Sequence, residues 1–278
     1  MTVLQTGLLH IGMFLYALSF LIACLYISSG SNKHIRAVQI LSVIAAILHS
    51  IMLLNIGVTN HYFPATNMFE SFVFMSVILV FFALAIDRIR SMPIITIITT
   101  LLVFSSLVVV IALLTPSDSG REVVKEEVKD FLTWFHVAVT LLSYVAFELA
   151  FITGIIYLLE QRQLKAKSRQ FLLGLFPSLE AVYRINVKSS IYGFLLLTLG
   201  IVIGYMKARG LYTTNEWRIS PRVILTTLTW AAYLIVVIFI AIPKFRGKKV
   251  TVASVCSFVF VILTFWATIF WKDFHYFK

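Results

Sequence analysis

The sequence predicts an all-α, polytopic membrane protein with eight transmembrane helices and both termini outside. Of its 278 residues, 60% are hydrophobic and only 13% are charged, whereas about a quarter of the residues of a soluble domain are charged. Eight apolar runs are long enough, or nearly so, to cross about 30 Å of hydrocarbon. Because backbone groups in lipid must pair within their own segment, each run is expected to be a helix.

The eight runs follow one another with short basic turns between several of them, such as "DRIR" and "KFRGKK". We expect spans at about residues 6–29, 37–58, 68–86, 93–114, 131–159, 190–206, 223–243 and 250–271. The first run has neither a charged n-region nor a small-residue cleavage site, so we expect a retained helix rather than a signal peptide. Little sequence remains for a soluble domain, and we therefore expect a single integral-membrane domain over residues 1–278.

The fifth span, which contains "WFHVAVTLLSYVAFELA", carries two polar groups that lipid does not favour. A rotation of about 100° per residue puts four residues on one stripe within about 20°. They are His136, Ser143, Phe147 and Gly154. The same projection puts Glu148 about 120° away, past the middle of the membrane, where an ionised carboxylate is costly. We therefore expect His136 and Glu148 to serve different contacts.

The loops differ in their content of Lys and Arg, which predicts the orientation. The loops 30–36, 87–92, 160–189 and 244–249 together hold 14 of the 23 basic residues, and the other loops with the termini hold 9. The first set is therefore placed in the cytoplasm, and loops 115–130 and 207–222 outside. Loop 160–189 begins as a basic helical extension of the fifth span and continues as an interfacial segment. Attraction of basic loops to anionic lipid explains the net charge of +11 without nucleic acid.

Five of the six histidines fall in the outer half of the predicted bundle, and only His34 lies in a cytoplasmic turn. The five are His10, His49, His61, His136 and His275. A single interfacial histidine is most often a polar anchor, but His136 and His275 both lie at helix ends on the same side. Imidazole is the commonest metal ligand, and two imidazoles on opposite faces of a porphyrin make a six-coordinate heme. Zinc or copper sites usually need further ligands close in sequence, and neither CxxC nor CxxCH is present.

Other residues of the outer half are secondary candidates for this site. His10, His49 and His61 can each replace one of the two predicted ligands. Glu70 is a further candidate, although in "TNMFES" it stands where Asn67 caps the third span and Glu70 completes a capping box.

The outer loop 207–222 carries groups suited to a porphyrin. Trp217 can lie against the macrocycle, and Arg209, Arg218 and Arg222 can hold propionates, since guanidinium pairs with a carboxylate in a bidentate way. The alternative is a Trp of the aromatic belt with arginines that face lipid headgroups.

These residues resemble the cytochrome c assembly superfamily of heme-handling membrane proteins, from about residue 49 to the C-terminus. Four segments carry the resemblance: "HYFPATNMFES" (61–71), "FHVAVTLLSY" (135–144), "LEAVYRINVKSSIYGFLLLTLGIVIG" (179–204) and "FHYF" (274–277). The resemblance implies non-covalent heme b at the outer face of the cell membrane. It also implies His136 and His275 as axial ligands, with Trp217, Arg218 and Arg222 in contact with heme or its propionates.

The tryptophan-rich loop of the family is degenerate in this chain. It keeps Trp217, Pro221, Arg222 and Trp230, but Ile219, Ser220 and Leu225 stand where the full signature has Trp, Asp and Trp. Ile238 or a close neighbour stands where a further histidine is expected. These departures suit the HemX branch, which is linked to heme synthesis. The resemblance implies a non-enzymatic role in lowering glutamyl-tRNA reductase levels. Regulation of a soluble enzyme needs a cytoplasmic surface, and loop 160–189 is the largest one predicted, so we expect this loop to contact the reductase.

Two other functions fit the sequence. One is a cytochrome c assembly factor that presents heme at the outer face. The other is a small secondary transporter or channel, which is disfavoured because inverted repeats and Gly/Pro-broken helices are not evident. The predicted spans also contain few acidic groups, namely Glu70 and Glu148, which further disfavours a transporter or channel.

The predicted orientation is tested by labelling with an impermeant thiol reagent. Cysteine placed at Ser119 is expected to react in intact cells, and cysteine placed at Ser168 is expected not to react. The opposite labelling would overturn the orientation and, with it, the placement of the site at the outer face.

Overall fold

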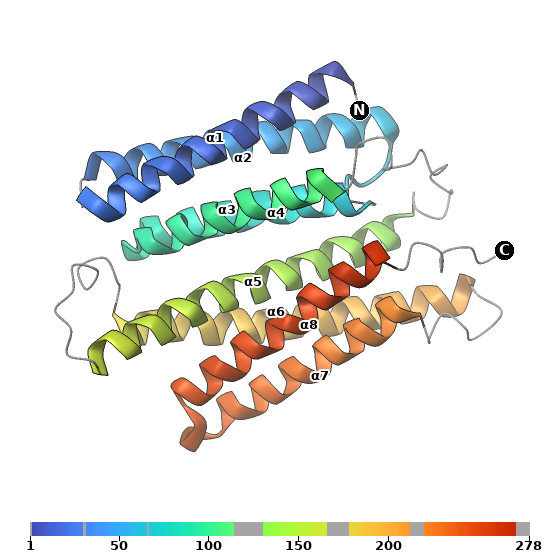
Figure 1. Cartoon of the computed structure of the whole chain (residues 1–278). Helices are drawn as coiled ribbons and strands as arrows, with labels where there is room; N and C mark the ends of the chain where they lie inside the picture. The colour runs from blue at the N-terminus through green and yellow to red at the C-terminus, as the bar shows by residue number, and fades with distance from the viewer. Residues whose placement is uncertain are drawn as a thin grey trace. The chain divides into compact units, whose positions relative to one another are not determined.

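The computed structural model describes residues 2–29, 32–65, 67–113, 130–165, 178–211 and 220–270, and the regular structure in these ranges is helical (Figure 1). The helices are α1 (Val3–Ser29), α2 (Asn32–Asn60), α3 (Met68–Arg90), α4 (Pro93–Leu113), α5 (Phe131–Lys165), α6 (Leu179–Leu211), α7 (Pro221–Ala241), η4 (Pro243–Phe245) and α8 (Lys248–Phe270). Within these ranges, eight helices are long and apolar enough to cross a membrane. The predicted all-helical class and the eight spans are confirmed.

Two helices extend beyond the predicted spans into loop 160–189. Helix α5 continues to Lys165, as the basic extension predicted. Helix α6 begins at Leu179 instead of residue 190, because its first turns are amphipathic: Val182, Tyr183 and Asn186 are buried while Arg184 is exposed. A search for continuous apolar runs overlooks such a start, since half of the helix surface is polar. Residues 166–177 lie outside the described ranges.

The described helices form two compact units, α1–α4 in the first and α5 from Phe135 onward with α6–α8 in the second. In the first unit, side-chain hydroxyl groups form hydrogen bonds between neighbouring helices. Ser42 of α2 lies 3.0 Å from Ser19 of α1 and 3.1 Å from Thr100 of α4. The Thr96 hydroxyl donates to the buried Asp87 carboxylate at 2.9 Å. These bonds satisfy polar groups that lipid would leave without partners.

In the second unit, glycines let α5 and α6 approach closely. A methyl group at Gly193 of α6 would overlap the ring of Phe147 of α5, which stacks on Tyr233 of α7 with centroids 3.5 Å apart. Lower on the same face, Asn186 of α6 donates a 2.6 Å hydrogen bond to the Ala150 carbonyl. Small residues and interhelical hydrogen bonds are the main sources of helix association in lipid. The second unit is therefore built around the α5–α6 contact.

Candidate functional site

The imidazole of His136, near the start of α5, lies against the backbone of α6. Its Nδ1 atom is 2.8 Å from the carbonyl oxygen of Gly200. A carbonyl oxygen only accepts, so Nδ1 carries the proton and donates it. A carbonyl has two lone pairs, and the Gly200 oxygen can accept this bond in addition to its intrahelical one. In the neutral ring, Nε2 then keeps its lone pair and is available as a ligand atom.

Two glycines one turn apart on α6 make room for this contact. A Cβ atom at Gly204 would lie 2.6 Å from Cε1 and 3.1 Å from Nδ1 of His136. A Cβ atom at Gly200 would lie 2.6 Å from the Thr140 hydroxyl, which donates to the His136 carbonyl at 2.8 Å. The ring orientation of His136 therefore depends on the absence of side chains at Gly200 and Gly204.

The predicted stripe on α5 is confirmed as a packing face of the second unit. His136 and Phe147 both contact glycines of α6, and a Cβ atom at Gly154 would lie 2.6 Å from Val255 of α8. Ser143 on the same stripe is fully buried. Glu148 is half-buried, and among the described residues it has no hydrogen bond or ion pair with His136. The two polar groups of α5 therefore belong to different surroundings, as expected.

Arg222 stands close to His136 at the start of α7. The Ser220 side chain caps this helix by accepting from the Val223 amide at 3.4 Å, and Pro221 occupies the first turn. One turn along α7 from Arg222, the Thr226 hydroxyl lies 3.5 Å from the Tyr144 hydroxyl of α5, so the start of α7 packs beside α5. Within the described ranges no hydrogen bond or ion pair occupies the Arg222 guanidinium, and its side chain is exposed. An imidazole with an available Nε2 and a cation thus lie near one another.

The structure describes three of the residues proposed as ligands or propionate contacts, which are His136, Arg209 and Arg222. His136 and Arg222 both lie in the second unit, near the starts of α5 and α7. His275, Trp217 and Arg218 lie outside the described residues. Arg209, in the last turn of α6, lies over the Tyr205 ring with its guanidinium carbon 5.5 Å from the centroid.

Trp230 and Ile238, two positions of the degenerate motif, lie on α7. The indole of Trp230 donates to the Thr198 hydroxyl of α6 at 2.9 Å and stacks on Phe194. Ile238 is 48% exposed. Trp230 therefore joins α7 to α6.

His49, a secondary candidate, is fully buried between α1 and α2 of the first unit. Its Nε2 atom lies 3.3 Å from the Leu9 carbonyl oxygen and its ring meets Tyr16 edge-on, with centroids 5.5 Å apart. A methyl group at Gly12 would overlap the ring. This enclosure leaves no open face for a large planar ligand, which disfavours His49 as an axial ligand.

The other secondary candidates also lie in the first unit. His10 and His61 are exposed. Glu70 is buried and accepts a 2.7 Å hydrogen bond from the Tyr62 hydroxyl. Its amide donates to the Asn67 side chain at 2.8 Å, which confirms the predicted cap of α3. The carboxylate of Glu70 therefore has a structural partner near the helix start.

Sequence reasoning overlooked the α6 contribution to the site. The signal was present: Gly193, Gly200 and Gly204 are seven and four residues apart, which places them on one face of a helix. The spacing does not indicate which neighbouring helix packs against this face.

Comparison with known proteins identifies relatives over most of the chain. The family described as "Cytochrome C assembly protein" matches residues 65–275. Protein HemX of Brevibacillus brevis is 27% identical over 220 residues, which cover 79% of each chain. Protein HemX of Bacillus subtilis is 23% identical and covers 78% of this chain and 77% of its own. Cytochrome c biogenesis protein CcsA of Prochlorococcus marinus is 22% identical, with 84% and 81% covered.

The hydrogen bond to Gly200 predicts the tautomer of His136. In ¹⁵N NMR spectra of histidine-labelled protein, His136 is expected to be protonated at Nδ1 and unprotonated at Nε2. His49 provides an internal control, because its Nε2 faces the Leu9 carbonyl and is expected to carry the proton. The variants His136→Gln and His49→Gln assign the two signals. A proton on Nε2 of His136 would contradict the arrangement.

Proposed function

This chain belongs to the cytochrome c assembly protein family, and we propose that it is a membrane protein that binds heme b without a covalent link. Nε2 of His136, together with His275, would hold the heme iron. The observation that carries the proposal is the 2.8 Å contact between Nδ1 of His136 and the Gly200 carbonyl. Histidines that ligate metals almost always donate their other ring N–H to a carbonyl, a carboxylate or water, which sets the tautomer and the ring orientation.

The surroundings of His136 fit a heme ligand in two further respects. The Arg222 guanidinium is not occupied by any described residue, and it matches the geometry of a propionate carboxylate. The Gly200 carbonyl accepts from Nδ1, and a Cβ atom at Gly204 would lie 2.6 Å from Cε1 and 3.3 Å from Nε2. The lone pair of Nε2 is thereby left for the iron, and the glycine at 204 leaves space beside it. Heme, when bound, would supply an iron that accepts nitrogen ligands and two propionate carboxylates that pair with guanidinium groups. Trp217 and Arg218 complete this assignment as contacts of the ring and the propionates.

The role we assign to heme binding is regulatory and non-enzymatic: it lowers the level of glutamyl-tRNA reductase and so limits heme synthesis. Two HemX proteins resemble this chain over more than three quarters of its length. Helix α5 runs without a break from Phe131 past His136 to Lys165, which lies within the predicted loop 160–189. Heme binding at His136 can shift this helix only if heme has different affinities for two positions of the helix. Loop 160–189 is then the surface offered to the reductase in the cytoplasm.

The second candidate function is cytochrome c assembly, with presentation of heme at the outer face of the cell membrane. It is favoured by the CcsA relative, which matches 84% of the chain. Deletion of the gene separates the two functions. The regulatory role predicts higher reductase levels with normal c-type cytochromes, whereas the assembly role predicts loss of c-type cytochromes.

The ligand assignment predicts the absorption spectra of variants. The purified protein is expected to show the spectrum of six-coordinate b-type heme. His136→Ala or His275→Ala is expected to weaken or abolish the Soret band, because each removes one axial ligand. His34→Ala is the control, since His34 bonds to the Ser29 hydroxyl in the first unit. An unchanged spectrum in the double variant at 136 and 275 would refute the assignment and direct the test to His10, His49 and His61.

The regulatory assignment predicts a separation of heme binding from reductase control. Replacement of four apolar residues of loop 160–189 by serine is expected to raise reductase levels in cells while heme binding stays intact. They are Phe171, Leu172, Leu175 and Phe176. The matched control replaces Val3 and Leu4, which are exposed at the start of α1. If the loop variant inserts normally, carries heme and leaves reductase levels unchanged, this loop is not the regulatory contact.

A further inference from the structure

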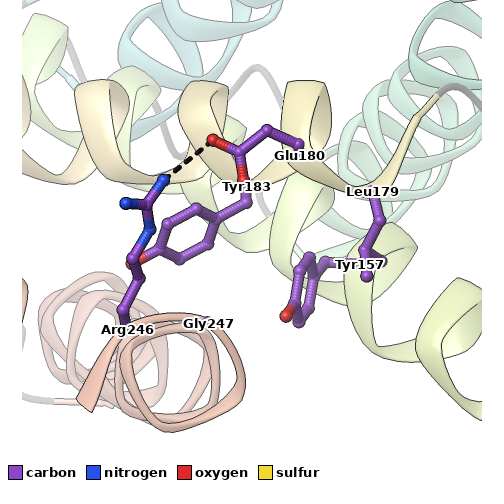
Figure 2. A pocket seen from close by; sticks show the side chains of 6 residues that line it. All are labelled: Tyr157, Leu179, Glu180, Tyr183, Arg246 and Gly247. Carbon is purple, nitrogen blue, oxygen red and sulfur yellow. Dashed lines mark hydrogen bonds and ion pairs between the residues drawn. The ribbon is translucent and has the colours of Figure 1, made fainter. Parts of the chain in front are cut away.

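A pocket of about 420 Å³ lies at the end of the second unit where α5 ends and α6 and α8 begin. Tyr157 lines it from α5, and Leu179, Glu180 and Tyr183 line it from the first turns of α6. Arg246 and Gly247 close it from the short connection that precedes α8. Figure 2 shows the side chains of Arg246, Tyr183 and Tyr157 around this space. It is at the opposite end of α5 from His136 and is a separate site.

Arg246 and Glu180 are the charged residues among those that line the pocket. Glu160, one turn after Tyr157 on α5, adds a second carboxylate nearby, and the basic residues beside the pocket outnumber these two. Arg246 lies 3.0 Å from the Glu180 carboxylate (Figure 2), and Arg184 approaches the same carboxylate at 3.9 Å. Both pairs are largely exposed to solvent, where ion pairs contribute little and exchange readily. One carboxylate thus serves two guanidinium groups. Residues 244–249 add Lys244, Lys248 and Lys249 without an acidic residue among them.

The pocket also offers neutral donors and space. The rings of Tyr157 and Tyr183 are buried at 6% and 7% exposure, and the guanidinium carbon of Arg246 lies 6.0 Å from the Tyr183 ring centroid. Gly247 has a φ of +83°, and a Cβ atom there would lie 3.0 Å from the Tyr157 hydroxyl. Glycine therefore permits both the turn into α8 and an open approach to this hydroxyl.

The place of the pocket within the fold indicates its ligand. It lies at the ends of membrane-spanning helices, where tyrosines and basic residues meet the layer of lipid headgroups. Basic pockets between such helices recognise anionic headgroups. Leu179 supplies an apolar wall beside the charged groups, which suits the boundary between a headgroup and its acyl chains. We propose that this pocket binds the phosphate group of an anionic phospholipid, with Arg246 as its principal charged contact and Glu180 as a competing anion.

Opposite effects of two variants test this site. Protein freed of lipid in a neutral detergent is titrated with dioctanoyl phosphatidylglycerol at constant ionic strength. The midpoint of thermal unfolding and native mass spectrometry report binding. Arg246→Gln is expected to weaken binding about fivefold, the effect of one basic side chain at an anionic lipid surface. Glu180→Gln is expected to strengthen binding by a similar factor, because it removes the anion that competes with the phosphate.

Three controls make the result decisive. Arg90→Gln removes the same charge from an exposed position in the last turn of α3, in the first unit, and is expected to bind as the unmodified protein does. Dioctanoyl phosphatidylcholine and inorganic phosphate are expected to give no saturable effect. Equal binding by the Arg246→Gln variant, weaker binding by Glu180→Gln, or saturation by phosphatidylcholine would each overturn the proposal. Saturation by inorganic phosphate alone would overturn the assignment to a lipid. The Glu180→Gln arm decides the question if the Arg246→Gln protein does not fold.

Discussion

The close antiparallel contact between α5 and α6 is the constraint on which the second unit and its site depend. Hydrocarbon gives no hydrophobic drive for two apolar helices to associate, so their contact relies on close packing and hydrogen bonds. Along this contact, small residues on one helix stand opposite larger side chains on the other. The pairs are His136 with Gly204, Thr140 with Gly200, Phe147 with Gly193, and Gly154 with Asn186. The same packing that joins the helices therefore orients the His136 ring.

The orientation of His136 has chemical consequences because the partner is a backbone carbonyl. The Gly200 carbonyl accepts from Nδ1 and thereby leaves the lone pair on Nε2. Helix α7 is held beside α6 by the hydrogen bond from Trp230 to Thr198. Its capped first turn then carries Arg222 to the neighbourhood of the imidazole. Three helices of one compact unit thus contribute to the proposed heme site: α5 supplies His136, α6 supplies the Gly200 carbonyl, and α7 supplies Arg222.

The eight spans could be predicted because a chain that crosses lipid has few alternatives to a helix, and run length then suffices. The α5 stripe and the Asn67 cap followed from local geometry alone. The early start of α6 could not be predicted in this way. Tyr183 and Asn186 are buried while Glu180 and Arg184 face outward, and mean hydropathy does not reveal this alternation. Periodicity within one helix does not indicate which helices are neighbours. For this reason the sequence did not predict the contact of His136 with Gly200 or the pocket at Arg246.

The central claim is that α6 holds the His136 imidazole in the orientation needed to ligate heme iron. The most direct test is the heme dissociation constant of Gly204→Ala, with Gly7→Ala as the matched control, because a Cβ atom at Gly7 meets no other atom within 4 Å. The account predicts that Gly204→Ala weakens heme binding by about 10–100-fold, as loss of a ligand's outer-shell hydrogen bond typically does, and that Gly7→Ala leaves it unchanged. Equal heme affinity in the two variants would contradict it.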